Sequence, residues 1–337
     1  GKTTPGVDLY CRKVLIMKHP EELLPEWMRF VKGVIDSEDL PLNISREALQ
    51  DSRIITKLQK VIVGKFLKFL GDQAKNNPEE YKEFYQVNGQ FLKEGIVQDF
   101  TNQAELAKLL RFETSKTEKG ETISLSDYVE RMKDGQEKIY YLNGPSRSAI
   151  EAGPYIEAFK DRDLEVIYTY ESIDDFVLNH LNQFEEKAIL SGDSGDVDFD
   201  EKIERPDAED ALEEDKVKEL CEWFKAQVGD GVKEVKSSKR LTSSPAVATT
   251  EGTISSTMQR MMATMGEEDM SKLGNMMTLE INPSHELIKK IEFMRHNDES
   301  FAKQLALQLY DNSLIAAGIM TDPRALVNRM NQLLYKA

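Results

Sequence analysis

The stretch that decides the fold is residues 124–184, which divide into SLSDYVERM (124–132), EKIYYLNG (137–144), SRSAIEAGPYIEAF (146–159), LEVIYTY (164–170) and SIDDFVLNHLNQF (172–184). The second and fourth segments are rich in branched and aromatic residues, as strands are, whereas the other three have helical patterns. Ser172 and Asp175 have the spacing of a capping box, which predicts the start of the last helix. Alternating helices and strands indicate βαβ units, so we expect a small α/β domain with a parallel sheet.

The chain before this stretch predicts the end of another α/β layer. Residues 7–17 (VDLYCRKVLIM) and 29–35 have the composition of strands. A long helix capped by Ser52 should follow, because apolar side chains recur there at three- and four-residue steps and form one stripe. The stripe consists of Ile54, Ile55, Leu58, Val61, Ile62, Phe66, Phe69 and Leu70. Asn77 followed by Pro78 predicts the start of a further helix.

The chain after this stretch predicts an acidic linker and an α+β domain. Carboxylates dominate residues 193–215, which hold few large apolar groups and read as solvated. Beyond them we expect a helix at 217–228, strands at 232–241, 245–250 and 278–283, a Met-rich helix and terminal helices. The predicted fold class is therefore α/β plus α+β. Its parts are the end of an α/β/α layer (1–76), connecting helices (77–122), a small α/β/α subdomain (123–192), the linker (193–215) and the α+β domain (216–337).

Composition excludes several classes of function. The 337 residues carry a net charge of −16, which disfavours nucleic acid and anionic lipid as partners. Cys11 and Cys221 lie far apart in sequence and predict neither a disulfide framework nor a zinc site. No apolar run approaches the roughly 20 residues that cross a bilayer. No phosphate-binding loop, HExxH pair or G-x-S-x-G elbow occurs, so we expect no metal site and no self-contained enzyme.

Arg46 and Gln50 form a candidate anion-binding pair. The segment DSEDLPLNISREALQ (36–50) reads as a strand end, a stiffened turn and a helix start, which places the two side chains one helical turn apart. A guanidinium beside an amide can reach an anion held by another domain, as an arginine finger does. Spacing alone favours the simpler interpretation, in which Arg46 pairs with a neighbouring carboxylate.

Two further helical stretches carry apolar faces. Residues 254–265 place Ile254, Met258, Met261 and Met262 on one face, and a Met-rich face suits partners of varied shape, although it is more often core. Residues 301–317 and 323–336 predict two terminal helices, which could form either an internal or an intermolecular bundle. The helical pattern does not choose between these alternatives.

The string DSEDLPLNISREALQ resembles the middle-domain catalytic loop of the 90-kDa heat-shock protein chaperone family. Further landmarks follow in family order: WMRFVKG, KLLRFETS, SLSDYVERMKDGQEKIYYLNG, LEINPSHELIKK and LIAAGIMTDPRALVNRMNQLL. The resemblance covers essentially the whole chain. It implies a start inside the family's middle domain and an end in its C-terminal dimerisation domain, without the nucleotide-binding N-terminal domain.

The resemblance implies part of an ATP-dependent chaperone that binds unfolded or partly folded client proteins. Arg46 and Gln50 match loop residues that reach the terminal phosphate of ATP, which the protein's own N-terminal domain holds together with magnesium. We therefore expect this chain alone to bind no cofactor and to be inactive. A non-enzymatic dimerisation scaffold without client binding is the alternative.

The resemblance also assigns surfaces by position. The residues matching client-contacting positions are Leu15, Asp175, Phe176, Asn179, Ile254, Met258, Met261 and Met262. Those matching the homodimer interface in the terminal helices are Leu305, Leu309, Ala316, Leu326, Met330 and Leu333.

Branch-specific segments indicate compartment and cochaperones. The ending LLYKA lacks the MEEVD peptide with which cytosolic eukaryotic members recruit tetratricopeptide-repeat cochaperones, so we expect no such partner. DYVERMKDGQEKIYYL resembles bacterial members, whereas AGIMTDPRALVNRMNQLLYKA resembles mitochondrial members. Together these segments favour the mitochondrial matrix over the bacterial cytoplasm.

Overall fold

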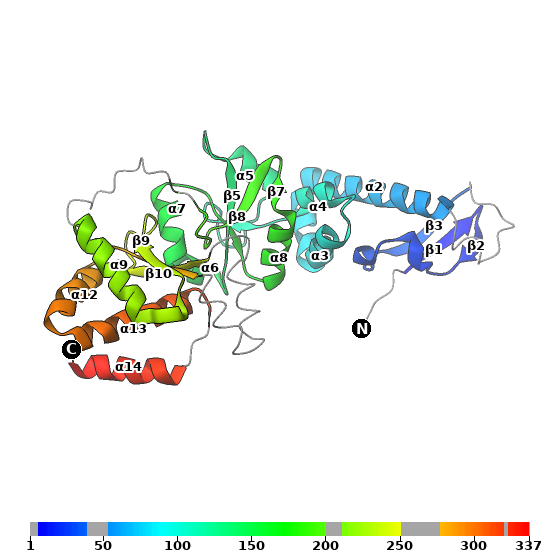
Figure 1. Cartoon of the computed structure of the whole chain (residues 1–337). Helices are drawn as coiled ribbons and strands as arrows, with labels where there is room; N and C mark the ends of the chain where they lie inside the picture. The colour runs from blue at the N-terminus through cyan, green and yellow to red at the C-terminus, as the bar shows by residue number, and fades with distance from the viewer. Residues whose placement is uncertain are drawn as a thin grey trace. The chain divides into compact units, whose positions relative to one another are not determined.

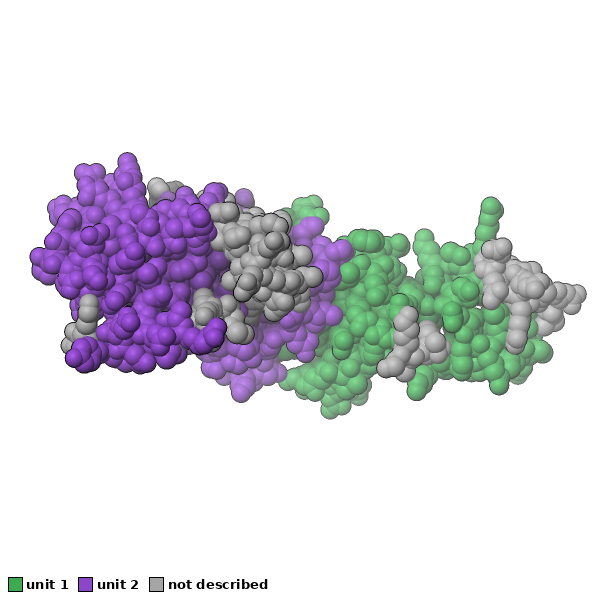
Figure 2. Space-filling view, turned by 60° about the horizontal axis from the view of Figure 1, so that its bottom comes forward, with its two compact units in different colours: residues 1–112, 122–130, 183–186 green, residues 113–121, 131–182, 187–337 purple. Residues whose placement is uncertain are grey.

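The computed structural model describes residues 6–38, 53–197, 199, 211–250, 277–319 and 323–336. The chain forms mixed α/β structure and divides into two compact units, which Figure 2 colours separately. The first unit comprises Gly1–Phe112, Thr122–Glu130 and Gln183–Glu186, and the second comprises Glu113–Glu121, Arg131–Asn182 and Lys187–Ala337. The domain boundaries at residues 76, 122, 192 and 215 remain predictions.

The first unit begins with a three-stranded sheet in the order β2-β1-β3 (Figure 1). Its strands are β1 (Gly6–Cys11), β2 (Val14–Met17) and β3 (Lys32–Asp36). The first predicted strand is in fact a hairpin, because Arg12 and Lys13 take positive φ angles of 46° and 68° and reverse the chain. β3 pairs in parallel with β1 and begins three residues later than predicted. Val7, Leu9 and Cys11 form the buried face of β1.

The other elements of the first unit are mostly helices. They are η1 (Glu21–Leu23), η2 (Glu26–Met28), α2 (Arg53–Asn76), α3 (Pro78–Gln98), α4 (Gln103–Leu109) and α5 (Leu125–Glu130), followed by the short strand β7 (Gln183–Phe184). Arg29 pairs with Glu94 of α3 and lies over the Phe91 ring, and Trp27 Nε1 donates to Asp99 Oδ2 at 3.2 Å. These contacts hold α3 against η2.

The long helix was predicted correctly, but its buried stripe was predicted only in part. Val61 and Phe69 are exposed, whereas Val63 and Leu67 are buried with Ile55 and Leu70. Because α2 carries apolar side chains on more than one face, periodicity alone did not identify the face that packs. The predicted cap, Ser52, lies outside the described residues.

The second unit contains a mixed sheet, in which the strands predicted at 137–144 and 164–170 pair in parallel (Figure 1). Its strands lie in the order β4-β6-β5-β8, with β5 parallel to both β6 and β8 and β4 antiparallel to β6. They are β4 (Glu113–Thr114), β5 (Lys138–Asn143), β6 (Ile167–Thr169) and β8 (Lys187–Ser191). The helices are α6 (Arg147–Glu151), η3 (Pro154–Ile156), α7 (Glu157–Asp161) and α8 (Ser172–Leu181).

The remainder of the second unit is α+β, as predicted. Its sheet has the order β10-β11-β9, with strands β9 (Glu234–Ser237), β10 (Ala246–Thr250) and β11 (Met277–Ile281). The helices are α9 (Glu214–Val228), η5 (Gly229–Gly231), α12 (Glu286–Asn297), α13 (Glu299–Ala316) and α14 (Pro323–Lys336). Side chains of α9, α12 and α13 share a core with β10 and β11. Every residue of these two strands is buried.

The small α/β part and the α+β part share one hydrophobic core. Tyr140 and Phe159 belong to the same cluster as Leu241, Val247 and Leu314. The described start of the segment predicted to be a solvated linker is not solvated. Asp193, Ser194, Val197 and Phe199 are buried, and Ser194 forms a β-bridge with Thr250. The carboxylates of this segment suggested solvation, but Val197 and Phe199 join the core and the backbone of Ser194 joins β10.

Candidate functional site

The predicted anion-binding pair, Arg46 and Gln50, lies outside the described residues. Strand β3, which precedes this pair in sequence, is well anchored: it pairs with β1 from Lys32 to Asp36. The Asp36 carboxylate also accepts the backbone N–H of Lys13 at 3.0 Å, which ties β3 to the β1–β2 turn. The chain thus enters the 36–50 segment from a fixed strand.

Leu15 lies on the outer face of the small sheet and is 41% exposed. Its cross-strand partner is Tyr10, and Val34 is paired with Asp8. Because Asp8 and Tyr10 are two residues apart on β1, Leu15 and Val34 share one face of the sheet. Val34 was not predicted as a surface residue. Together they form a small exposed apolar surface.

Helix α8 separates the three predicted client-contacting residues that it carries. Phe176 is 50% exposed and stacks on His180 with ring centroids 6.2 Å apart. Asn179 is partly buried. Asp175, by contrast, is only 3% exposed, and its carboxylate accepts the hydroxyl of Tyr141 at 3.0 Å. In this structure Asp175 therefore supports the helix from inside and is not a contact residue at the surface.

The start of α8 also differs from the prediction. The capping box uses Glu171 and Asp174, so the predicted pairing of Ser172 with Asp175 was wrong by one residue. Asp175 lies on the inner face, toward Tyr141. Burial first, and the Asp175 charge second, raise the pKa of the Tyr141 phenol, which therefore remains protonated and donates its hydrogen bond.

The predicted dimer residues divide between the interior and the surface. Leu309 of α13 is 3% exposed and packs in the chain's own core with α9 and α12, so a partner chain cannot reach it here. Leu305 packs partly against the same core. Ala316 and Met330 are exposed, and Leu326 and Leu333 are half-buried. The pattern of α13 suited both an internal and an intermolecular bundle, and Leu309 serves the internal one.

Helix α14 has an exposed apolar face that the sequence analysis recognised only in part. Val327, Met330 and Leu334 are all exposed and follow a spacing of three and four residues, which places them on one face. We call these three residues the α14 face. Polar contacts hold α14 on α13: Arg329 pairs with Asp311, and Gln304 donates to Gln332 at 3.4 Å. The i, i+3, i+7 spacing was the signal that could have identified the face.

The remaining predicted client residues, Ile254, Met258, Met261 and Met262, lie outside the described residues. Within the part of the chain that the structure describes, no three His, Cys, Asp or Glu side chains converge as metal ligands. The described helices include none that is both long and apolar enough to cross a bilayer.

Two charged side chains, Arg240 and Glu157, connect the parts of the second unit by hydrogen bonds. The sequence did not predict either of them. Arg240 is buried and donates to the carbonyl oxygens of Gly192 and Ser194, and its Nε lies 3.3 Å from Glu280. Glu157 accepts hydrogen bonds from the loop 242–244. Glu157 lies at least 85 residues from its partners, and Arg240 lies at least 46 residues from the carbonyls that it contacts. Contacts between residues so far apart leave no local pattern in the sequence.

Comparison with known proteins places the whole chain in one family. Residues 1–337 match the family model described as Hsp90 protein. The chain is 51% identical over 338 residues to the chaperone protein HtpG of Desulfitobacterium hafniense (strain Y51), which covers 100% of this chain and 54% of that protein. It is 42% identical over 343 residues to the mitochondrial heat shock protein 75 kDa of Rattus norvegicus, and the match covers 98% of this chain and 48% of that protein.

A third relative is the mitochondrial TNF receptor-associated protein 1 homolog of Dictyostelium discoideum, 39% identical over 337 residues, with 99% of this chain and 47% of that protein covered. The chain spans about half the length of the curated relatives it matches. The predicted resemblance, to both bacterial and mitochondrial members, is confirmed. The chain belongs to the Hsp90 family.

Proposed function

We propose that the chain is the middle and C-terminal part of an ATP-dependent chaperone that dimerises and binds partly folded proteins. The observation that carries this proposal is the family match along all 337 residues. The chain spans about half of each relative. In this proposal a nucleotide-binding N-terminal domain belongs to the same protein.

The ATP site of the whole protein takes Arg46 and Gln50 from this chain. In this proposal the N-terminal domain binds ATP with magnesium, and the Arg46 guanidinium stabilises the charge that develops on the terminal phosphate. Full-length Arg46→Ala should therefore lose turnover while its nucleotide affinity changes little, because the other binding contacts lie in the N-terminal domain. Steady-state ATP hydrolysis and nucleotide titration measure the two quantities. Unimpaired turnover of that variant would remove Arg46 from the reaction.

Dimerisation uses the α14 face, together with the exposed Ala316 at the end of α13. Support comes from three apolar side chains left in water along one helix, since such a face is stabilised when a second copy covers it. Leu326, Leu333 and Leu305 position α14 and α13 beneath that interface. Leu309 contributes through the core that supports α13.

Client binding uses exposed apolar side chains on both units. Leu15 and Phe176 are the described candidates, Asn179 lies beside Phe176, and Asp175 positions α8 from within. Ile254, Met258, Met261 and Met262 complete the proposed client surface. Suppression of the heat aggregation of a denatured reporter enzyme by this chain tests the proposal. A chain that forms a stable dimer but fails to suppress aggregation would instead be a structural scaffold.

The two candidate compartments are the bacterial cytoplasm and the mitochondrial matrix. The identity of 51% to a bacterial relative, against 42% to a mitochondrial one, supports the bacterial cytoplasm. This order is the reverse of the one that the terminal segment favoured in the sequence analysis.

A further inference from the structure

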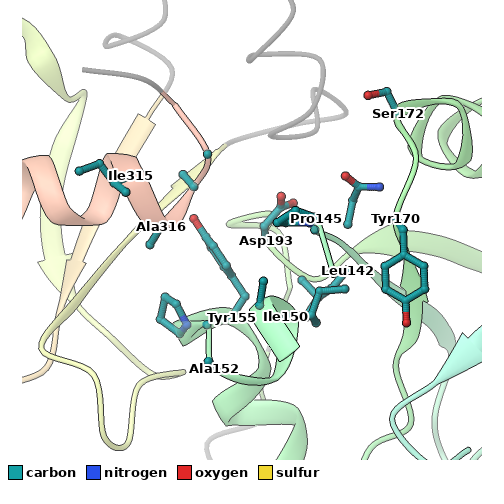
Figure 3. A pocket seen from close by; sticks show the side chains of 17 residues that line it. Leu142, Pro145, Ile150, Ala152, Tyr155, Tyr170, Ser172, Asp193, Ile315 and Ala316 are labelled. Atoms are coloured by element: carbon teal, nitrogen blue, oxygen red, sulfur yellow. The ribbon is translucent and has the colours of Figure 1, made fainter. Parts of the chain in front are cut away.

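A cleft of about 620 Å³ lies within the second unit, where the small α/β part meets the end of α13 (Figure 3). One wall comes from the end of β5 and from α6 and η3, and the other comes from residues 315–318. Most of the lining is apolar and includes Leu142, Pro145, Ile150, Tyr155 and Ile315. Cavities of roughly 300–1,000 Å³ suit small organic ligands.

One carboxylate lies in this apolar lining. Asp193 is 5% exposed and lines the cleft, near Pro145 in Figure 3. Its one hydrogen bond to a described residue comes from the Ser191 hydroxyl, at 2.6 Å to Oδ1. The guanidinium of Arg240 donates to the carbonyl oxygens of Gly192 and Ser194, on either side of Asp193, and not to the Asp193 carboxylate. A buried carboxylate is stabilised by a charged hydrogen-bond donor more than by a neutral hydroxyl. Asp193 thus favours a cation in the cleft.

The end of α13 has the same electrostatic preference. This helix is 18 residues long and ends at Ala316, in the wall of the cleft. Aligned peptide dipoles give a helix C-terminus a partial negative charge, which stabilises nearby cations. None of the described residues that line the cleft is Lys, Arg or His. Among these described lining residues, therefore, no basic side chain competes for Asp193.

We propose that this cleft binds a small apolar molecule that carries one protonated amine. The apolar body lies against Leu142, Ile150, Tyr155 and Ile315, and the ammonium group pairs with Asp193 near the end of α13. Such a ligand contacts both parts of the second unit at once. Neither the ATP site nor the client surface enters this inference, so it stands apart from the proposed function.

Calorimetric titration with hexylamine and 1-hexanol tests the charge preference, because both probes carry the same alkyl chain. A charge-assisted hydrogen bond should make hexylamine bind about tenfold more tightly than hexanol. In Asp193→Asn, which keeps an acceptor for Ser191, that difference should disappear. Equal affinity of the two probes for the unmodified chain would overturn the proposal.

Two control variants separate the cleft from general attraction to an acidic protein. Ala152→Trp fills the cleft from an exposed lining position and should abolish binding of both probes. Glu137→Gln removes one exposed carboxylate elsewhere and should leave both affinities unchanged. Circular dichroism establishes that each variant is folded. Undiminished hexylamine binding by a folded Ala152→Trp would place the amine elsewhere and reject this cleft.

Discussion

The carboxylate of Glu157 accepts hydrogen bonds from both the hydroxyl and the backbone N–H of Ser244. The same carboxylate also accepts the backbone N–H groups of Thr242, at 2.8 Å, and Ser243, at 3.0 Å. Glu157 is the first residue of α7 in the small α/β part, and the three donors precede β10 in the α+β part. One charged side chain thus satisfies three successive backbone donors of another part of the fold.

Glu157→Gln should lower the free energy of unfolding of the second unit. A neutral amide accepts these hydrogen bonds more weakly than a carboxylate does, and its own N–H₂ group faces donors. Hydrogen bonds to charged groups contribute about 1.5–3 kcal/mol, so we expect a loss of about 1–3 kcal/mol in urea denaturation. Glu137→Gln, an exposed change of the same type, should stay within about 0.5 kcal/mol of the unmodified chain. Equal stability of the two variants would contradict the assigned role.

The stabilisation by Glu157 should depend on pH. Burial raises the pKa of its carboxyl, but the hydrogen bonds from Ser244, Thr242 and Ser243 lower it more, and the net pKa lies below the ordinary 4.5. Because the folded pKa is below the unfolded one, the stabilisation is complete above the unfolded pKa and is lost as pH falls through the folded pKa. The stability difference between the unmodified chain and Glu157→Gln should therefore be constant near neutral pH and shrink in acid. A difference that grows on acidification would reverse the assigned sign.

Leu334→Glu should weaken the proposed dimer without unfolding the chain. Leu334 is 70% exposed, so its replacement removes few internal contacts, but it adds a charge to the α14 face. Multi-angle light scattering should show a shift toward the monomer mass, with stability within about 0.5 kcal/mol. Leu309→Ala serves as the matched core change: it should cost about 2–5 kcal/mol by leaving a cavity. A Leu334→Glu chain that remains dimeric would exclude the α14 face.

Replacing two neighbouring residues of α8 should affect two different properties, reporter binding and stability. Phe176→Ala should weaken binding of a partly unfolded reporter protein with little change in melting temperature, because Phe176 is half-exposed. Asp175→Ala should lower stability by about 1–3 kcal/mol, because it leaves the buried Tyr141 hydroxyl without this acceptor. Fluorescence anisotropy and thermal denaturation measure the two effects. If Phe176→Ala binds the reporter normally, α8 is not a client surface.

The parallel arrangement of β5 and β6 could be predicted because local composition determines it. Residues 137–144 and 164–170 are strand-like runs separated by a helix, and a short crossover of this kind forces parallel pairing. The position of α9 was predicted for a similar reason, since its apolar side chains repeat with helical spacing.

The inward or outward direction of single side chains could not be predicted in the same way. The resemblance assigned Asp175 to a surface beside Phe176, whereas the Asp175 carboxylate faces Tyr141 inside the fold. Val197 and Phe199 alternate with aspartates, and the number of charges concealed this strand-like alternation. Long-range partners such as Glu157 with Ser244 depend on the folded core and leave no trace in local sequence.

The core shared by Phe159, Val166, Leu241 and Val247 has a consequence for how this protein can be divided. A fragment cut within the acidic segment would expose to water the apolar surface that Phe159 and Val166 cover, and it should aggregate even though its own secondary structure is intact. A shorter chain that keeps the α+β part soluble should retain the sequence from Glu113 onward. The most polar segment of this protein is therefore a poor place to cut it.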